Sequence, residues 1–211
     1  MGAWGIGFGI LAVVALQDSV PPEDLLMDRT TAGRQPWYFG FVTALGILAW
    51  TVTVCSCAFT TWTAHFSRRL AARNAFAAAA CLFAFLLFDD LFRLHSDVFP
   101  SLFSVSKHAV MATYLFGTAA WTLVSWRELQ RTRFELLIAA LVGLGGSLLY
   151  DMFYSGADTG TRVLIEDGLK FLGLVALATW ATATAADISR AAIVARQTAD
   201  SDADELVAAT Q

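Results

Sequence analysis

Charged residues are scarce in this chain of 211 residues, of which they make up only 15%. Soluble domains carry about 25% charged and about 45–50% apolar residues, whereas 57% of this chain is hydrophobic and its mean hydropathy is +0.58. The apolar residues lie in long blocks separated by short polar stretches, as in chains that cross a bilayer several times. The composition therefore argues against an ordinary soluble domain and predicts a single membrane domain.

Cysteines and basic runs are also sparse. The three cysteines, Cys55, Cys57 and Cys81, lie inside apolar blocks, where we expect them to pack as small apolar side chains. The net charge is -4, and no run of lysine or arginine suggests binding to nucleic acid. The sequence has no phosphate-binding glycine loop, haem motif or nucleotide fingerprint. The expected partner is therefore the lipid bilayer, and a second copy of the chain or a membrane partner subunit remains an open alternative.

Six apolar segments predict an all-α fold, a polytopic transmembrane helix bundle of about six helices. They cover residues 2–16, 37–65, 74–93, 107–126, 134–154 and 162–186, within a membrane domain of residues 1–186. The connection 17–36 contains Pro21 and Pro22, so it predicts a surface loop. Residues 187–211 predict a cytoplasmic tail that begins as an amphipathic turn and is partly disordered at its acidic end.

The first segment has a second interpretation, as a cleaved signal peptide. Residues 13–15 (VVA) resemble a cleavage site. The segment has no basic residues at its start, which favours a retained helix. Its removal would leave five spans and would not change the orientation of the others.

Basic residues are unevenly distributed between the two sets of predicted loops. One set holds eight arginines: Arg68, Arg69, Arg73, Arg127, Arg131, Arg133, Arg190 and Arg196. The opposite set holds only Arg29, Arg34, Lys107 and Arg162. Because short loops rich in lysine and arginine stay in the cytoplasm, the first set and both termini are predicted to be cytoplasmic. The alanine-rich chain favours a bacterial inner membrane.

Ionisable residues recur near the outer ends of three predicted helices. At a rise of about 1.5 Å per residue, Asp90, Asp151 and Lys170 each lie about 24–25 Å along their helices from the cytoplasmic end. The hydrocarbon core of a bilayer is about 30 Å thick. The three helices therefore place charged groups at one depth, which predicts a polar pocket in the outer half of the membrane.

The pocket is predicted to bind a proton or a cation, for transport or sensing. Its candidate residues are five carboxylates, Asp89, Asp90, Asp151, Glu166 and Asp167, with Arg93, Lys170 and Lys107 as charge partners. Helical spacing predicts that Asp89 pairs with Arg93 and that Lys170 pairs with Glu166 or Asp167. With Arg93 and Lys170 alone as counter-ions, three negative charges stay uncompensated, and each charge deep in a bilayer costs at least about 2.5–3 kcal/mol. This deficit is the basis of the functional prediction.

Two other functions remain open. Asp90, His95, His108, Asp151 and Asp167 are ligand types for zinc or a harder divalent metal, which would suit a metal-dependent intramembrane hydrolase acting on lipid. Membrane hydrolases of the ceramidase and adiponectin-receptor type carry paired histidines four residues apart, and this chain does not. Alternatively, the polar layer holds helices together in a structural or partner-binding subunit. A retinal-binding role for Lys170, as in microbial rhodopsins, is disfavoured by the count of six helices rather than seven.

Two segments carry a resemblance to known sequences. FDDLFRLH at residues 88–95 and EDGLK at residues 166–170 resemble segments of uncharacterised bacterial multi-pass membrane proteins. The resemblance extends over most of the hydrophobic region. It implies a membrane architecture and draws attention to these two segments, but it implies no activity or cofactor.

Overall fold

A computed structural model describes residues 2–17, 40–153 and 159–209. Within these ranges the chain is helical and contains no strand, which confirms the predicted all-α fold. The helices are α1 (Gly2–Leu16), α3 (Phe41–Phe66), α4 (Leu70–Phe92), the π-helix η2 (Leu94–Val98), α5 (Phe99–Phe103), α6 (Lys107–Leu129), α7 (Phe134–Phe153) and α8 (Thr159–Ala209).

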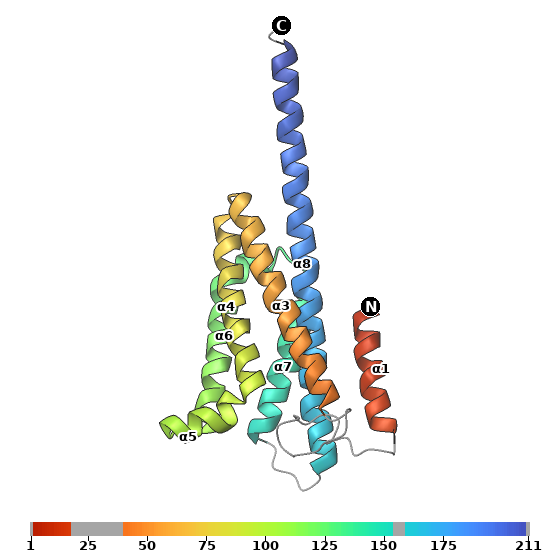
Figure 1. The fold of residues 1–211 in the computed structure, drawn as a ribbon, viewed down its shortest axis with the longest axis vertical. Helices are drawn as coiled ribbons and strands as arrows, with labels where there is room; N and C mark the ends of the chain where they lie inside the picture. The colour runs from red at the N-terminus through yellow and green to blue at the C-terminus, as the bar shows by residue number, and fades with distance from the viewer. Residues whose placement is uncertain (1, 18–39, 154–158, 210–211) are drawn as a thin grey trace.

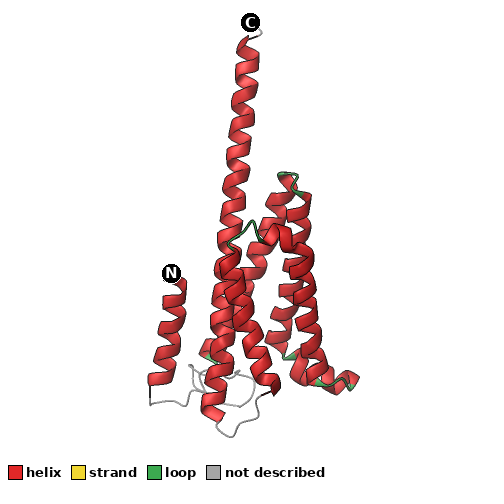
Figure 2. Cartoon of the chain, turned by 180° about the vertical axis from the view of Figure 1, so that it is seen from behind, coloured by secondary structure: helices red, strands yellow, loops and turns green. Residues whose placement is uncertain are grey.

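The long helices α3, α4, α6, α7 and α8 run up and down in a bundle (Figure 1). Tight turns join α3 to α4 and α6 to α7 at one end of the bundle, while η2, α5 and the start of α8 lie at the other. Helix α1 lies beside α8, and α8 continues far beyond the bundle to the C-terminus (Figures 1 and 2). The polar segments of the chain are thus collected at the two ends of an apolar bundle.

Four helices are long and apolar enough to cross a membrane: α3, α4, α7 and residues Gly160–Thr198 of α8. The other two predicted spans also form helices. Helix α1 has only 15 residues, whereas a perpendicular span needs about 20. Helix α6 has 23 residues and is less apolar, because it carries a lysine, an arginine and several hydroxyl side chains. Of these, Tyr114 and Thr118 line the cavity described below. Four helices of this length and hydropathy suggest a membrane protein. The sequence predicted six membrane-spanning helices, so two of the predicted spans do not meet this criterion.

Large apolar side chains point away from the bundle. Val124 is 89% exposed, Phe116 76% and Val142 67%. Soluble monomers rarely expose apolar surface on this scale, and such surface marks contact with a partner or with lipid. The exposed side chains therefore fit a bundle surrounded by acyl chains.

The core of the bundle is a chain of aromatic rings. Ring centroids are 5.9 Å apart for Trp50 and Phe83, 5.2 Å for Phe83 and Trp121, 6.2 Å for Trp121 and Trp180, and 5.8 Å for Trp180 and Phe76. The buried indole N–H of Trp121 donates to the Ala75 carbonyl at 3.0 Å. These rings link α3, α4, α6 and α8 into one core.

Helices α7 and α8 approach each other closely at two glycines. A methyl group added at Gly143 would lie 2.8 Å from the Cα of Gly173, and one added at Gly173 would lie 2.7 Å from the Leu144 nitrogen. Only hydrogen fits at either position. The two backbones are therefore in direct contact, as is common between small residues of membrane helices.

Several predicted helix ends are wrong. Helix α4 begins at Leu70 rather than residue 74, and α8 continues to Ala209 rather than ending at about Ala186. The chain has no glycine or proline after Gly173, and its many alanines favour helix, so nothing local terminates α8. The predicted tail at 187–211 is thus helical through Ala209. Most of the predicted loop 17–36, and the last residue of the predicted helix 134–154, lie outside the described residues.

The arginine-rich loops lie together at one end of the bundle (Figure 1). Arg69 beside the α3–α4 turn is 3.6 Å from Glu128 at the end of α6. Arg133 in the α6–α7 turn is 3.2 Å from Asp187 on α8. The arginines predicted to share one face of the membrane therefore share one end of the molecule.

Candidate functional site

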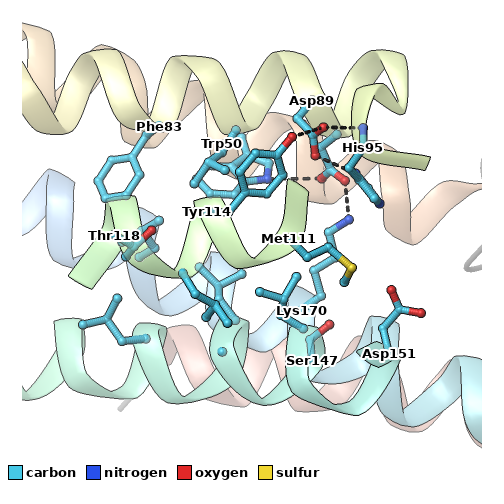
Figure 3. A pocket seen from close by; sticks show the side chains of 18 of the residues that line it. Trp50, Phe83, Asp89, His95, Met111, Tyr114, Thr118, Ser147, Asp151 and Lys170 are labelled. Atoms are coloured by element: carbon cyan, nitrogen blue, oxygen red, sulfur yellow. Dashed lines mark hydrogen bonds and ion pairs between the residues drawn. The ribbon is translucent and has the colours of Figure 1, made fainter. Parts of the chain in front are cut away.

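A cavity of about 520 Å³ lies inside the opposite end of the bundle, between α4, α6, α7 and α8. Polar side chains gather at its outer end, and its inner end is apolar (Figure 3). All five predicted carboxylates line this one cavity, together with Lys170, His95, Trp50 and Tyr114. The structure thus brings together the residues that the sequence placed at a common depth.

Asp89 accepts three hydrogen bonds and is only 5% exposed. Its Oδ1 accepts from the His95 backbone N–H at 2.8 Å and from the Tyr114 hydroxyl at 2.7 Å, and its Oδ2 lies 2.7 Å from His95 Nδ1. Helix α4 ends at Phe92, and the next residue, Arg93, has a left-handed φ of 53°. This turn folds the following π-helix back, so that His95 lies over the carboxylate.

The predicted pair of Asp89 with Arg93 is therefore replaced by Asp89 with His95. The guanidinium Nε of Arg93 lies 3.5 Å from the Ser96 hydroxyl instead. Spacing of four residues brings two side chains together only while the helix is regular. The left-handed residue at the end of α4 breaks this regularity.

Asp90, the next residue, binds Lys170 across the bundle. The Lys170 ammonium donates to Asp90 Oδ1, and the indole N–H of Trp50 donates to Oδ2 at 3.2 Å. The sequence predicted Glu166 or Asp167 as the partner of Lys170. Since α8 packs beside α3 and faces α4 across the cavity, the flexible lysine side chain reaches a carboxylate on another helix rather than one on its own.

Within the described ranges, the Asp167 carboxylate differs from the other four in its lack of a bonding partner. No hydrogen-bond or ion-pair partner for it is found in the part of the chain that the structure describes, although it lies within electrostatic range of Lys170. Asp167 lines the main cavity and also a second cavity of about 20 Å³ beside α3. Asp90 and Lys170 line both cavities as well. These three residues therefore lie between the two cavities, and they are called the Asp90–Lys170–Asp167 cluster below.

Asp151 on α7 binds two cations at the outer end of the cavity. It lies 2.6 Å from Lys107 Nζ and 3.3 Å from Arg162. Arg162 also lies 3.8 Å from Glu166, one helical turn further along α8. Lys107 is the predicted partner. Arg162 was assigned to a loop, although its spacing from Glu166 is a signal that could have placed it here.

Trp50 and Tyr114 are site residues that sequence reasoning missed. Both lie within long apolar segments, where an aromatic side chain is normally core. Nothing in their local sequence distinguishes them from the other aromatics. Only the packing of α3 and α6 beside α4 directs their N–H and O–H groups to Asp90 and Asp89.

Four of the five predicted metal ligands line the cavity, but they do not form a metal-binding group. Asp90 and Asp151 are each bound to lysine, and His95 is bound to Asp89. His108 is exposed at the start of α6 and does not line the cavity. Among the described residues, no group of three or more histidines, cysteines and carboxylates is placed to hold a metal ion. The geometry of this chain therefore offers little support for a metal-dependent hydrolase.

The charges of the site do not balance. Five carboxylates face three permanent cations, Lys107, Arg162 and Lys170. Two negative charges remain in excess when His95 is neutral, and one remains when it is protonated. The excess is smaller than the sequence predicted, because Lys107 and Arg162 pair with Asp151, whereas the Arg93 guanidinium lies beside the Ser96 hydroxyl.

The chain belongs to a family defined by a domain of unknown function, DUF8692, whose model matches residues 5–184. The match includes every residue of the site and both segments on which the resemblance rested. Comparison with curated proteins and with solved structures finds no match. The family therefore establishes common descent over the bundle, and any function must be argued from the site itself.

Proposed function

We propose that this chain is a membrane protein that binds a proton or a cation at the Asp90–Lys170–Asp167 cluster and responds to it as a sensor. The proposal rests on the environment of the Asp167 carboxylate. This group lies on an apolar helix, lines an internal cavity, and has no hydrogen-bond or ion-pair partner among the described residues.

An uncompensated charge at this depth is costly. Insertion of an ionised side chain at the centre of a membrane helix costs about 2.5–3.5 kcal/mol. Lys170 cannot neutralise Asp167 fully, because it forms an ion pair with Asp90. A proton on Asp167, or a cation shared by Asp167 and Asp90, would remove the excess charge.

The bundle supports binding better than conduction. The charged groups of the cavity lie near the outer end, whereas the rings of Phe83, Trp121 and Trp180 pack against one another at its apolar end and beyond. Buried threonines in that half donate mostly to their own helix, as Thr53 and Thr60 do at 2.9 and 2.8 Å. Within the described part of the chain these threonines form no continuous polar path, so a bound ion would return to the side from which it came.

Infrared difference spectroscopy of the protein in nanodiscs would test the proposal. We expect a carboxylic-acid C=O band that changes with pH, or on addition of methylammonium, and that Asp167→Asn removes. Asp187→Asn is the matched control, because Asp187 lies at the opposite end of the bundle and is half exposed. A wild-type spectrum without such a band, or one that Asp167→Asn leaves intact, would contradict the proposal.

A flux assay separates sensing from transport. In proteoliposomes under a pH gradient, we expect wild type to pass protons no faster than empty liposomes do. A proton flux in wild type that Asp167→Asn abolishes would support the binding site, but it would show that the protein is a transporter rather than a sensor.

A further inference from the structure

The cavity changes from polar to apolar along its length. On α6 its lining runs from Tyr114 through Thr118 and Thr122 to Leu123, and on α7 it runs from Asp151 to Leu141. At a rise of about 1.5 Å per residue, these stretches extend about 14 and 15 Å from the outer end towards the middle of the bundle. The charged lining residues of α4, α7 and α8 therefore lie near the outer end, and the lining further in is mostly apolar. Thr122, the inner polar residue of α6, donates its hydroxyl to the Thr118 carbonyl of its own helix at 2.8 Å.

The apolar part of the cavity opens sideways, between α6 and α7. Ala119 and Leu123 line the cavity, yet both are exposed, Leu123 to 73%. Gly145, on the facing side of α7, also lines it, and a methyl group added there would meet no atom within 4 Å. Val124 and Val142, the chain neighbours of the lining residues Leu123 and Leu141, are exposed as well. The apolar part of the cavity therefore lies next to the surface that would contact acyl chains.

We infer that the cavity holds a single-chain amphiphile with an ammonium head, a long-chain amine that enters from the bilayer between α6 and α7. This inference rests on the proposed function and identifies the bound cation as that ammonium group. A membrane amphiphile places its head at the interface and its tail towards the midplane. The cavity has the same polarity in the same direction, so such a molecule enters without turning over.

Charge complementarity selects the head group. The excess carboxylate at Asp167, beside Asp90, attracts an ammonium group and repels a carboxylate or phosphate. The cations that could attract an anion, Lys107 and Arg162, are already bound to Asp151. Trp50 and Tyr114 line the same end, and aromatic rings can stabilise ammonium groups further.

The size of the cavity selects the tail. Its volume of about 520 Å³ falls within the range of about 300–1,000 Å³ that is usual for small-molecule sites. That space accommodates one alkyl chain with a small head rather than a phospholipid with two chains.

Binding of hexadecylamine, measured by native mass spectrometry from nanodiscs, would test the inference. Hexadecanoic acid and hexadecanol carry the same chain with a different head. We expect hexadecylamine to bind wild type at least about tenfold more tightly than either, and Asp167→Asn to lose about tenfold, as expected when one contact to a charged group is removed. Equal binding of the three compounds would overturn the inference, because it would show partitioning onto apolar surface.

Variants at Gly145 test the apolar half of the cavity. Gly145→Trp and the smaller Gly145→Leu should block hexadecylamine while preserving the response of the carboxyl band to pH, which also shows that the variants fold. Gly9→Trp on α1 is the matched control, since Gly9 likewise has open space around it. If Gly145→Trp and Gly145→Leu both keep the band and bind hexadecylamine as wild type does, the amphiphile is excluded and the proton or cation site stands. Absence of the band in wild type would instead overturn the proposed function.

Discussion

Asp90 on α4 and Lys170 on α8 form an ion pair although 80 positions separate them in the chain. The pair joins two helices inside an apolar bundle, and the Trp50 indole on α3 donates to the same carboxylate. Three helices thus meet at one carboxyl group. Since Asp167 lies beside it without a partner among the described residues, the pair is both a structural contact and the boundary of the proposed binding site.

Removal of Lys170 alone should be strongly destabilising. Lys170→Gln leaves Asp90 with an uncompensated buried charge, and breaking a buried ion pair from one side costs about 3–5 kcal/mol. The double variant Asp90→Asn with Lys170→Gln removes both charges and should recover most of that loss. Reversible unfolding in mixed micelles, analysed as a double-mutant cycle, measures the coupling. Additive losses would show that the two side chains do not interact.

Tyr114→Phe should destabilise the bundle by about 1.5–3 kcal/mol, because it removes a hydrogen bond to a charged, buried carboxylate. The ring and its packing remain. Phe116→Leu, two residues away and 76% exposed, serves as the control and should change the free energy of unfolding little. If Tyr114→Phe has no larger effect than this control, the Tyr114 hydroxyl is not bound to Asp89.

Gly143→Ala should destabilise the contact between α7 and α8 by about 1–3 kcal/mol, the usual cost of overpacking a close contact. The added methyl group would lie 2.8 Å from the Gly173 Cα, and backbone cannot move aside as a flexible side chain does. Gly145→Ala, on the same helix and without an atom nearby, should leave the melting temperature unchanged or raise it slightly. Equal melting temperatures for the two variants would contradict the close helix contact.

Lys107 and Arg162 should substitute for each other. Each binds a different oxygen of Asp151, so Lys107→Gln alone leaves that carboxylate paired and should cost about 1 kcal/mol or less, as for a partly exposed ion pair. Combining Lys107→Gln with Arg162→Gln removes both partners and should cost more than the sum of the single variants. Unfolding measurements on the three variants would show this. Strict additivity would mean that Asp151 does not couple the two cations.

The arginine-rich end of the bundle should face the cytoplasm. In a cysteine-free background, Ser101→Cys on α5 should react with a membrane-impermeant maleimide in intact cells, because it lies at the end with few basic residues. Arg131→Cys, at the arginine-rich end, should react only after the membrane is permeabilised. Both positions are exposed, so access to the reagent depends on sidedness. The reverse pattern would invert the proposed orientation.

The sequence by itself determined the helical membrane character of the chain and the common depth of its ionisable groups. Both follow from local properties of the sequence. The length of an apolar block indicates whether a helix can span the membrane, and the rise per residue gives the position of each residue along its helix. Helix ends were less predictable where no glycine or proline marked them. The continuation of α8 from Ala186 to Ala209 was missed for that reason.

Only the tertiary structure decided which charged groups meet. Helical spacing suggested Asp89 with Arg93 and Lys170 with a carboxylate on its own helix, whereas packing selected His95 and Asp90. Residues at one depth can pair in several ways, and the choice depends on how each helix is rotated about its axis and on which neighbours it has. The cavity and its opening between α6 and α7 depend on the same arrangement, because the sequence of a single helix does not show where a space between helices will lie.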